Sequence, residues 1–115
     1  MAKQTNYSLE NISDEKAFEE LVLKPQLPVV VNFYAPWAIS AIALNKLLEK
    51  VIIPKYGRET KFYKIDVEIA GLNEVVRDLE IKSLPALYIF KKGNVIGKTS
   101  LLTQELVEEF LNRCL

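Results

Sequence analysis

The sequence contains no histidine and a single cysteine, Cys114. One cysteine cannot form an internal disulfide bond, and zinc and copper sites normally draw on several imidazole and thiolate ligands. The histidine that serves as general base for most serine and cysteine nucleophiles is missing as well. These absences exclude most familiar metal sites and nucleophilic triads, and we expect no metal and no cofactor.

The sequence also has no excess of positive or negative charge, because 15 lysine and arginine side chains balance 15 aspartate and glutamate side chains. A neutral chain with a pI near 6.3 offers no basic surface to a phosphate backbone or an anionic membrane. The four glycines are dispersed, so the sequence has no glycine-rich phosphate loop. We therefore expect neither nucleic acid nor membrane among the partners.

No apolar run has the length or uniformity of a membrane span. The longest apolar region, residues 27–48, is interrupted by Asn32, Pro36, Ser40 and Asn45. Residues 1–7 lack the apolar core of a secretory signal. Together with the lone cysteine, this start fits a reducing cytosolic setting, so the expected location is cytoplasmic.

The length of 115 residues is typical of one domain with one hydrophobic core, and we expect a single domain over residues 1–115. Residues 1–12 are a polar lead-in with room for a short edge strand. Hydrophobic periodicity then predicts helices and strands that alternate along the chain. The expected helices cover residues 13–22, 40–53, 71–79 and 103–114, and the expected strands cover residues 29–34, 61–67, 86–90 and 95–99.

Local signals mark the ends of these elements. Ser13 and Thr103 are expected N-caps, and Pro54 with Gly57 is expected to stop the second helix. The Gly93-Asn94 pair predicts a tight turn between two antiparallel strands. The apolar faces expected for the first and last helices are Ala17, Phe18, Leu21 and Val22, and Leu106, Val107, Phe110, Leu111 and Cys114, the last as a packed structural thiol.

Strands joined by crossover helices are parallel, and a hairpin adds one antiparallel strand. This order predicts an α/β protein with a central mixed sheet of four to five strands, flanked by about four helices.

Three segments resemble the thioredoxin family. Val29–Trp37 (VVVNFYAPW) is similar to the central strand and the tryptophan that introduce the family's redox site. Lys64–Glu68 (KIDVE) is similar to the next strand. Ser83–Ala86 (SLPA) and Phe90–Gly93 (FKKG) are similar to the cis-proline loop and the hairpin. The motifs occur in the family's order over roughly residues 13–115, so the resemblance implies a thioredoxin fold.

The resemblance breaks at the redox site. Where the family carries Trp-Cys-Gly-Pro-Cys, this chain has Trp37-Ala38-Ile39-Ser40-Ala41. The family's thiol–disulfide exchange needs an attacking thiolate and a second thiol, so alanine at both positions implies a redox-inactive protein. Ser40 has no evident base, and we expect it to be a helix-start residue that accepts a backbone hydrogen bond.

Asn32 stands where the family usually has a buried aspartate that helps to move protons. An amide keeps hydrogen bonds but takes up no proton at neutral pH. Without a thiol to serve, a buried charge would only add desolvation cost. Lys64 matches a lysine that the family often places near that acid, and the alternative is a strand lysine that extends to solvent.

An apolar patch is expected where the redox groove would be, formed by Trp37, Ile39, Ile42, Leu84 and Leu101. Helical periodicity places the two isoleucines on the charged side of their helix. Patches of a few hundred Å² tend to mark contact sites. The alternative is that Ile39 or Leu101 turns inward and fills space left by smaller groups.

The resemblance also implies a cis bond before Pro85, which in the family exposes backbone groups that pair with an extended peptide. Leu84 and Ala86 are then candidates to bind a strand by β-augmentation. The candidate binding residues are Trp37, Ile39, Ser40, Ile42, Leu84, Pro85, Ala86 and Leu101, whereas Asn32, Ala38 and Ala41 occupy the family's catalytic positions.

Three functions remain open. The favoured one is a redox-inactive thioredoxin-like protein whose former active-site face binds a protein or an extended peptide. The second is an active protein-disulfide oxidoreductase whose two cysteines were replaced by alanine, although Asn32, Ile39, Ser40 and Leu101 also depart from the family pattern. The third is a structural module in which the patch is a homodimer seam.

Overall fold

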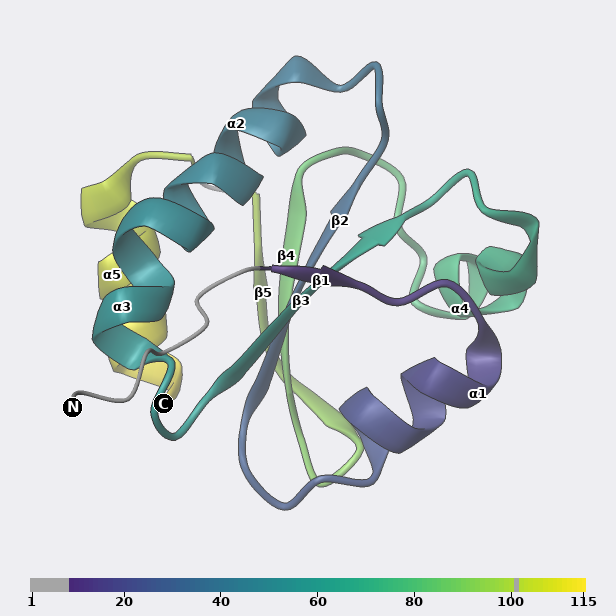
Figure 1. Cartoon of the computed structure of the whole chain (residues 1–115), viewed down its shortest axis with the longest axis horizontal. Coiled ribbons are helices and arrows are strands. Elements are labelled where there is room, and N and C mark those ends of the chain that lie inside the picture. The colour runs from purple at the N-terminus through teal and green to yellow at the C-terminus, as the bar shows by residue number, and fades with distance from the viewer. Residues whose placement is uncertain (1–8, 101) are drawn as a thin grey trace, which may run out of the picture.

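The computed structural model describes residues 9–100 and 102–115, and its centre is a mixed five-stranded sheet (Figure 1). The strand order is β1-β3-β2-β4-β5. β3 runs parallel to both β1 and β2, whereas β4 runs antiparallel to β2 and β5. The strands are β1 (Glu10–Asn11), β2 (Val29–Tyr34), β3 (Lys61–Asp66), β4 (Ala86–Lys91) and β5 (Asn94–Thr99). The predicted α/β class and mixed sheet are confirmed.

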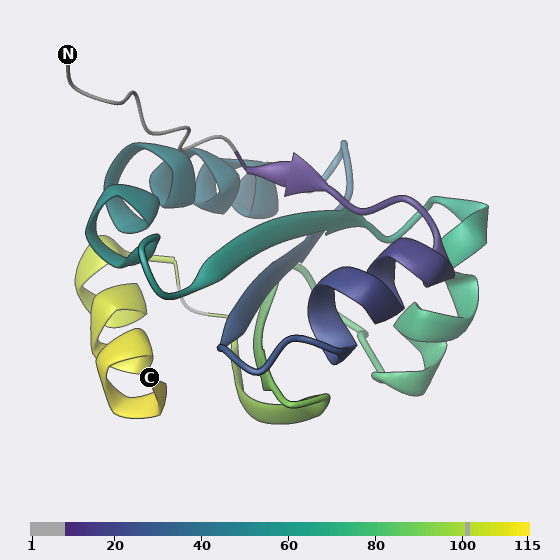
Figure 2. The same ribbon diagram turned by 60° about the horizontal axis from the view of Figure 1, so that its bottom comes forward.

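Helices cover both faces of the sheet (Figures 1 and 2). One face carries a continuous helical stretch and the C-terminal helix. These are α2 (Ile39–Leu47), the π-helical η2 (Leu48–Ile52), α3 (Ile53–Tyr56) and α5 (Gln104–Cys114). The other face carries α1 (Glu15–Phe18), the π-helical η1 (Glu19–Leu23), the 3₁₀ turn η3 (Ala70–Leu72) and α4 (Asn73–Asp78).

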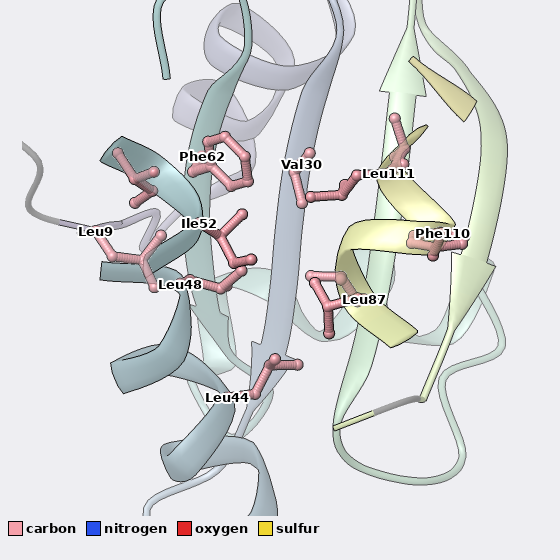
Figure 3. Packing of buried hydrophobic residues seen from close by; sticks show 12 residues of the cluster. Leu9, Val30, Leu44, Leu48, Ile52, Phe62, Leu87, Phe110 and Leu111 are labelled. Carbon is pink, nitrogen blue, oxygen red and sulfur yellow. The ribbon is translucent and has the colours of Figure 1, made fainter. Parts of the chain in front are cut away.

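β2 lies in the middle of the sheet because its run of β-branched and aromatic residues is buried on both faces. Alternate residues therefore contribute to two separate cores. The core under α2, α3 and α5 contains Val30, Leu44, Leu48, Leu87 and Phe110 (Figure 3). The core under α1 and α4 contains Val31, Phe33, Ile65, Leu72 and Phe90. Each residue of β2 therefore faces one of these two cores, according to its position in the alternation.

The first helix differs from the prediction at both ends. Asp14, not Ser13, is the N-cap, because its carboxylate accepts a hydrogen bond of 2.8 Å from the backbone N–H of Ala17. Leu21 is exposed, while Leu23 packs against the core. The helix changes from α to π geometry at Glu19, which alters the angle between successive residues. The buried face predicted with α-helical spacing is therefore wrong at Leu21.

The second helix does not stop at Pro54 but continues to Tyr56 and ends at Gly57. Pro54 is the second residue of α3 and follows η2 directly, so the helical stretch passes through the proline and loses only the hydrogen bond that its missing N–H would donate. The preceding segment, η2, is π-helical.

The β4–β5 hairpin forms as predicted, but its turn lies one residue earlier. Lys92 and Gly93 have positive φ angles of 52° and 82° and form the two-residue turn, so Asn94 already pairs with Lys91. The register shifts further along, where Val95 pairs with Phe90 and Gly97 with Ile89. Ile96 between them is an extra residue, which makes a β-bulge on the edge strand.

The last helix begins as predicted, since the Thr103 hydroxyl accepts a hydrogen bond from the N–H of Leu106 at 3.3 Å. Val107, Phe110 and Leu111 are buried, but Leu106 is exposed. Cys114 packs against the core and lies next to Gly97, where an added Cβ would come within 2.8 Å of its sulfur. Its predicted structural position is confirmed.

Candidate functional site

The residues at the thiol positions lie at the carboxyl end of β2, where the chain turns into α2. The N–H of Ala38 donates to the carbonyl of Ala35 at 3.0 Å, and Ala38 is the N-cap of α2. Ala38 has no side chain that can cap the helix. Ser40, expected at the helix start, is instead the second residue of α2 and is exposed.

The alanine side chains at positions 38 and 41 are packed, with exposures of 8% and 0%. They form a small apolar cluster with Ala35, and Tyr34, Val67 and Leu84 pack against it. The loop before β4 therefore contacts the start of α2 through Leu84.

Trp37 and Ile39 project from this turn into solvent, with exposures of 66% and 85%. The indole N–H of Trp37 donates a hydrogen bond to the carboxylate of Glu68. Glu68 is itself anchored, because its backbone N–H donates to the carboxylate of Asp66 at 2.9 Å. Because the side chain of Ile39 is exposed, the alternative in which Ile39 turns inward is wrong.

The remaining candidate binding residues that the structure describes are less accessible. Ile42 and Leu84 are half-buried, and Pro85 and Ala86 are buried. The peptide bond between Leu84 and Pro85 is cis. Leu101 lies outside the described residues. The structure thus brings Trp37, Ile39, Ile42 and Leu84 to the accessible part of the site.

Asn32 lies behind the alanines, fully buried on the face of β2 that meets α2. Its amide donates to the carbonyl of Ala41 at 3.2 Å and to Oδ1 of Asn45 at 2.8 Å. Its own Oδ1 is the one buried side-chain nitrogen or oxygen without a hydrogen-bond partner in the described part of the chain. Both donors of the amide are therefore used inside the protein.

Asn45 was not singled out from the sequence, where it is only an interruption of an apolar region. A signal was present, because Asn45 follows Ala41 by four residues and therefore lies on the same side of α2. Buried amides need hydrogen-bond partners, so a buried Asn32 implied a polar side chain on the facing helix.

Lys64 pairs in register with Asn32 on the neighbouring strand, and its ammonium nitrogen lies 5.8 Å from the centre of the Tyr34 ring. The Tyr34 hydroxyl donates to Oδ1 of Asn11 at 2.8 Å. Burial and the nearby Asp66 carboxylate raise the pKa of Tyr34. Lys64 thus forms a cation–π contact over Tyr34.

No helix in residues 9–100 and 102–115 is long and apolar enough to cross a membrane. The same residues contain no group of three or more histidine, cysteine, aspartate or glutamate side chains that could hold a metal ion.

Several thioredoxins are similar to this chain in sequence. Thioredoxin Asp f 29 of Aspergillus fumigatus is 29% identical over 81% of this chain and 83% of that protein. Mitochondrial thioredoxin of Bos taurus is 29% identical over 90% of this chain, which spans only 61% of the bovine protein. Probable thioredoxin-2 of Caenorhabditis elegans is 31% identical over 90% of this chain and 70% of that protein.

Solved structures show the same fold. The thioredoxin of Malassezia sympodialis (Mala s 13) superposes with a TM-score of 0.76 at 19% identity, over 99% of this chain and 96% of that chain. A chain from the study of thiol resolution in yeast mitochondrial 1-Cys peroxiredoxin superposes with a TM-score of 0.79 at 24% identity, over 92% of this chain and 95% of that one. The family model Thioredoxin matches residues 10–112. With this match over nearly the whole chain and the five-stranded mixed sheet, the protein belongs to the thioredoxin family and has the thioredoxin fold.

Proposed function

We propose that this protein carries out no thiol–disulfide exchange and that its former active-site face binds an extended peptide or a protein surface. The observation that carries the proposal is the pair of packed alanine side chains at the two thiol positions, beside an indole that is 66% exposed. Disulfide exchange forms and breaks S–S bonds by thiolate attack. A methyl group has no nucleophilic lone pair, so recognition is the property that this face retains.

The contact surface consists of Trp37, Ile39, Ile42 and Leu84. Trp37 supplies a large, amphipathic side chain of the type enriched in binding hot spots. Leu84 packs on the alanine cluster at the foot of this surface. The backbone of Leu84 and Ala86 is expected to pair with an extended strand, whose side chains would then lie over Ile39 and the indole.

Asn32 supports the loss of redox chemistry independently of the alanines. Its buried amide is held by Ala41 and Asn45, and an amide accepts no proton at neutral pH. Removing two thiols from an active enzyme would require no change at position 32. This favours native loss of activity over the alternative of a disabled oxidoreductase.

Binding can be followed through Trp37, because it is the chain's one tryptophan. Titration with an unfolded, thiol-blocked protein that has no tryptophan of its own, such as reduced, carboxymethylated ribonuclease A, should change the indole emission saturably. Ile39→Lys should weaken this binding about tenfold, the loss of about 1.4 kcal/mol. Leu27→Lys is the matched control, because Leu27 is also an exposed apolar side chain but lies outside the contact surface. Equal effects of the two substitutions would contradict the proposal.

The chemical part of the proposal is tested by installing both cysteines, Ala38→Cys and Ala41→Cys, with Asn32 retained. Negligible reduction of a model protein disulfide is expected. Strong turnover would favour the oxidoreductase alternative. A mass that rises with concentration in sedimentation, and falls back in Ile39→Lys, would favour the homodimer seam instead.

A further inference from the structure

A groove of about 320 Å³ lies on the face of the sheet that carries α1 and α4. Phe18 and Phe90 are buried at its base, where their rings meet edge to face with centroids 5.7 Å apart. Val95 stands at its edge and is 42% exposed. The apolar lining comes from α1, η1, α4, β4 and β5 and consists of Phe18, Leu23, Val75, Leu79, Phe90 and Val95.

The polar part of the lining is acidic. It consists of the side chains of Glu15, Glu19 and Asp78. None of the described residues that line the groove is basic. Lys24 lies 3.9 Å from Glu19 and Arg77 lies 4.0 Å from Asp78, both as exposed pairs. Such pairs contribute at most about 1 kcal/mol, so an incoming cation can replace either of them.

The two helical segments beside the groove carry the same sign of charge. Asp14–Lys24 has four carboxylates against two lysines, and Asn73–Glu80 has three carboxylates against one arginine. Lys91 and Lys92 lie in the adjacent hairpin, between Phe90 and Gly93. With them, the surface holds seven carboxylates against five basic side chains, so it keeps an acidic excess on a chain that is neutral as a whole. It would repel an anionic membrane or a nucleic acid and attract a positively charged partner.

From the apolar base and the acidic edge, we propose that this groove binds a short basic segment of a partner protein, in which a large aliphatic side chain is flanked by lysine or arginine. The aliphatic side chain fills the space over Phe18 and Phe90. The flanking cations meet Glu15, Glu19 and Asp78. The volume is near the lower limit of ligand sites, which suits one or two side chains of a short segment.

This site is separate from the proposed contact surface around Trp37. Gly93 lines the groove beyond one end of β4, whereas Ala86 begins β4 at the other end, next to the cis bond. The two surfaces share no residue, so one can be occupied without the other. Failure of binding at one surface therefore leaves the other proposal intact.

The test uses a short synthetic peptide with adjacent leucines flanked on both sides by lysines, added to the ¹⁵N-labelled full chain. The amide signals of Phe18, Gly93 and Val95 should shift saturably, and the indole signal of Trp37 should not. Raising the salt concentration should weaken binding. Absence of saturable shifts at millimolar peptide, or shifts confined to the Trp37 surface, would overturn the proposal.

Matched variants separate the groove from its surroundings. Val95→Lys should weaken peptide binding at least tenfold, whereas Ile96→Lys, at a neighbouring position of 41% exposure outside the groove, should leave it unchanged. Glu19→Lys should weaken it similarly, with Glu109→Lys on α5 as the control. Equal affinity of the two β5 variants, or equal binding of a peptide with glutamate in place of lysine, would refute the assignment.

Discussion

Asn32 on β2 donates a hydrogen bond of 2.8 Å to Oδ1 of Asn45 on α2, and both side chains are buried. Replacing Asn45 by alanine leaves one N–H of the Asn32 amide without a partner in the core. We expect Asn45→Ala to lower the free energy of unfolding by about 1–3 kcal/mol, the cost of a buried donor left unsatisfied. Urea denaturation monitored by circular dichroism measures this change, and an unchanged midpoint would contradict it.

Asn32→Asp tests the same position with a titratable group. Burial disfavours the charged form, so the pKa of the new carboxyl group should rise above its ordinary value of about 3.9. The folded state then holds the proton to higher pH than the unfolded state, and the free energy of unfolding falls as pH rises from about 4 through the folded-state pKa. Urea midpoints at about pH 4 and pH 8 should differ more for this variant than for the parent chain. Parallel pH profiles would show that the carboxylate is solvated.

Exposure separates the proposed contact surface from the core. Ile39→Lys should change the free energy of unfolding by less than about 0.5 kcal/mol, because the side chain is 85% exposed. Leu44→Ala, five residues further along the helix and buried, should cost about 2–5 kcal/mol. Thermal denaturation compares the two, and a large loss in Ile39→Lys would mean that this residue belongs to the core.

Gly97 lies against the C-terminal helix with no room for a side chain. A Cβ there would lie 2.8 Å from the sulfur of Cys114 and 3.2 Å from the Phe110 ring. Gly97→Ala should therefore destabilise the protein by about 1–3 kcal/mol through overpacking. Part of the loss should disappear in the Cys114→Ala background, so a double-mutant cycle should give a coupling energy of at least about 0.5 kcal/mol. Strict additivity would contradict the close contact.

Glu108 connects α5 to α3 and should make stability depend on pH. Hydrogen bonds from Gln104 at 2.8 Å and Lys55 at 3.0 Å lower the pKa of its carboxyl group. This stabilisation is present above the unfolded-state pKa and is lost as pH falls through the folded-state pKa. Glu108→Gln should flatten the rise in unfolding free energy that accompanies an increase in pH from the acidic range up to about 4.5. Glu109→Gln, at the adjacent exposed position, is the control and should not flatten it.

The strands were largely predictable, because each consists of residue types that favour a strand. The run Val29–Tyr34 has the same bounds in prediction and structure, since β-branched and aromatic residues indicate a strand buried on both faces. Helix details were less predictable. The exposed Leu21 follows from a π-helical segment, and the turn at Lys92 depends on the register of β4 against β5.

At the site, sequence comparison located the two alanines and Asn32, because each stands within a motif. Asn45 and the acidic groove were missed for a common reason. Asn45 acts as a hydrogen-bond acceptor for Asn32 on β2, a residue of another element. The groove is lined by residues that are far apart in the sequence. Patterns along one element do not report such contacts between elements.

The extra residue at Ile96 also affects how the sheet meets other molecules. A strand that approaches β5 needs an unbroken row of N–H and C=O groups, and the bulge interrupts that row and increases the local twist. The opposite edge is β1, which is only two residues long. Short strands and bulges are devices that prevent edge-to-edge association. The bulge on β5 and the shortness of β1 therefore disfavour association of the sheet with the strands of other molecules at these two edges.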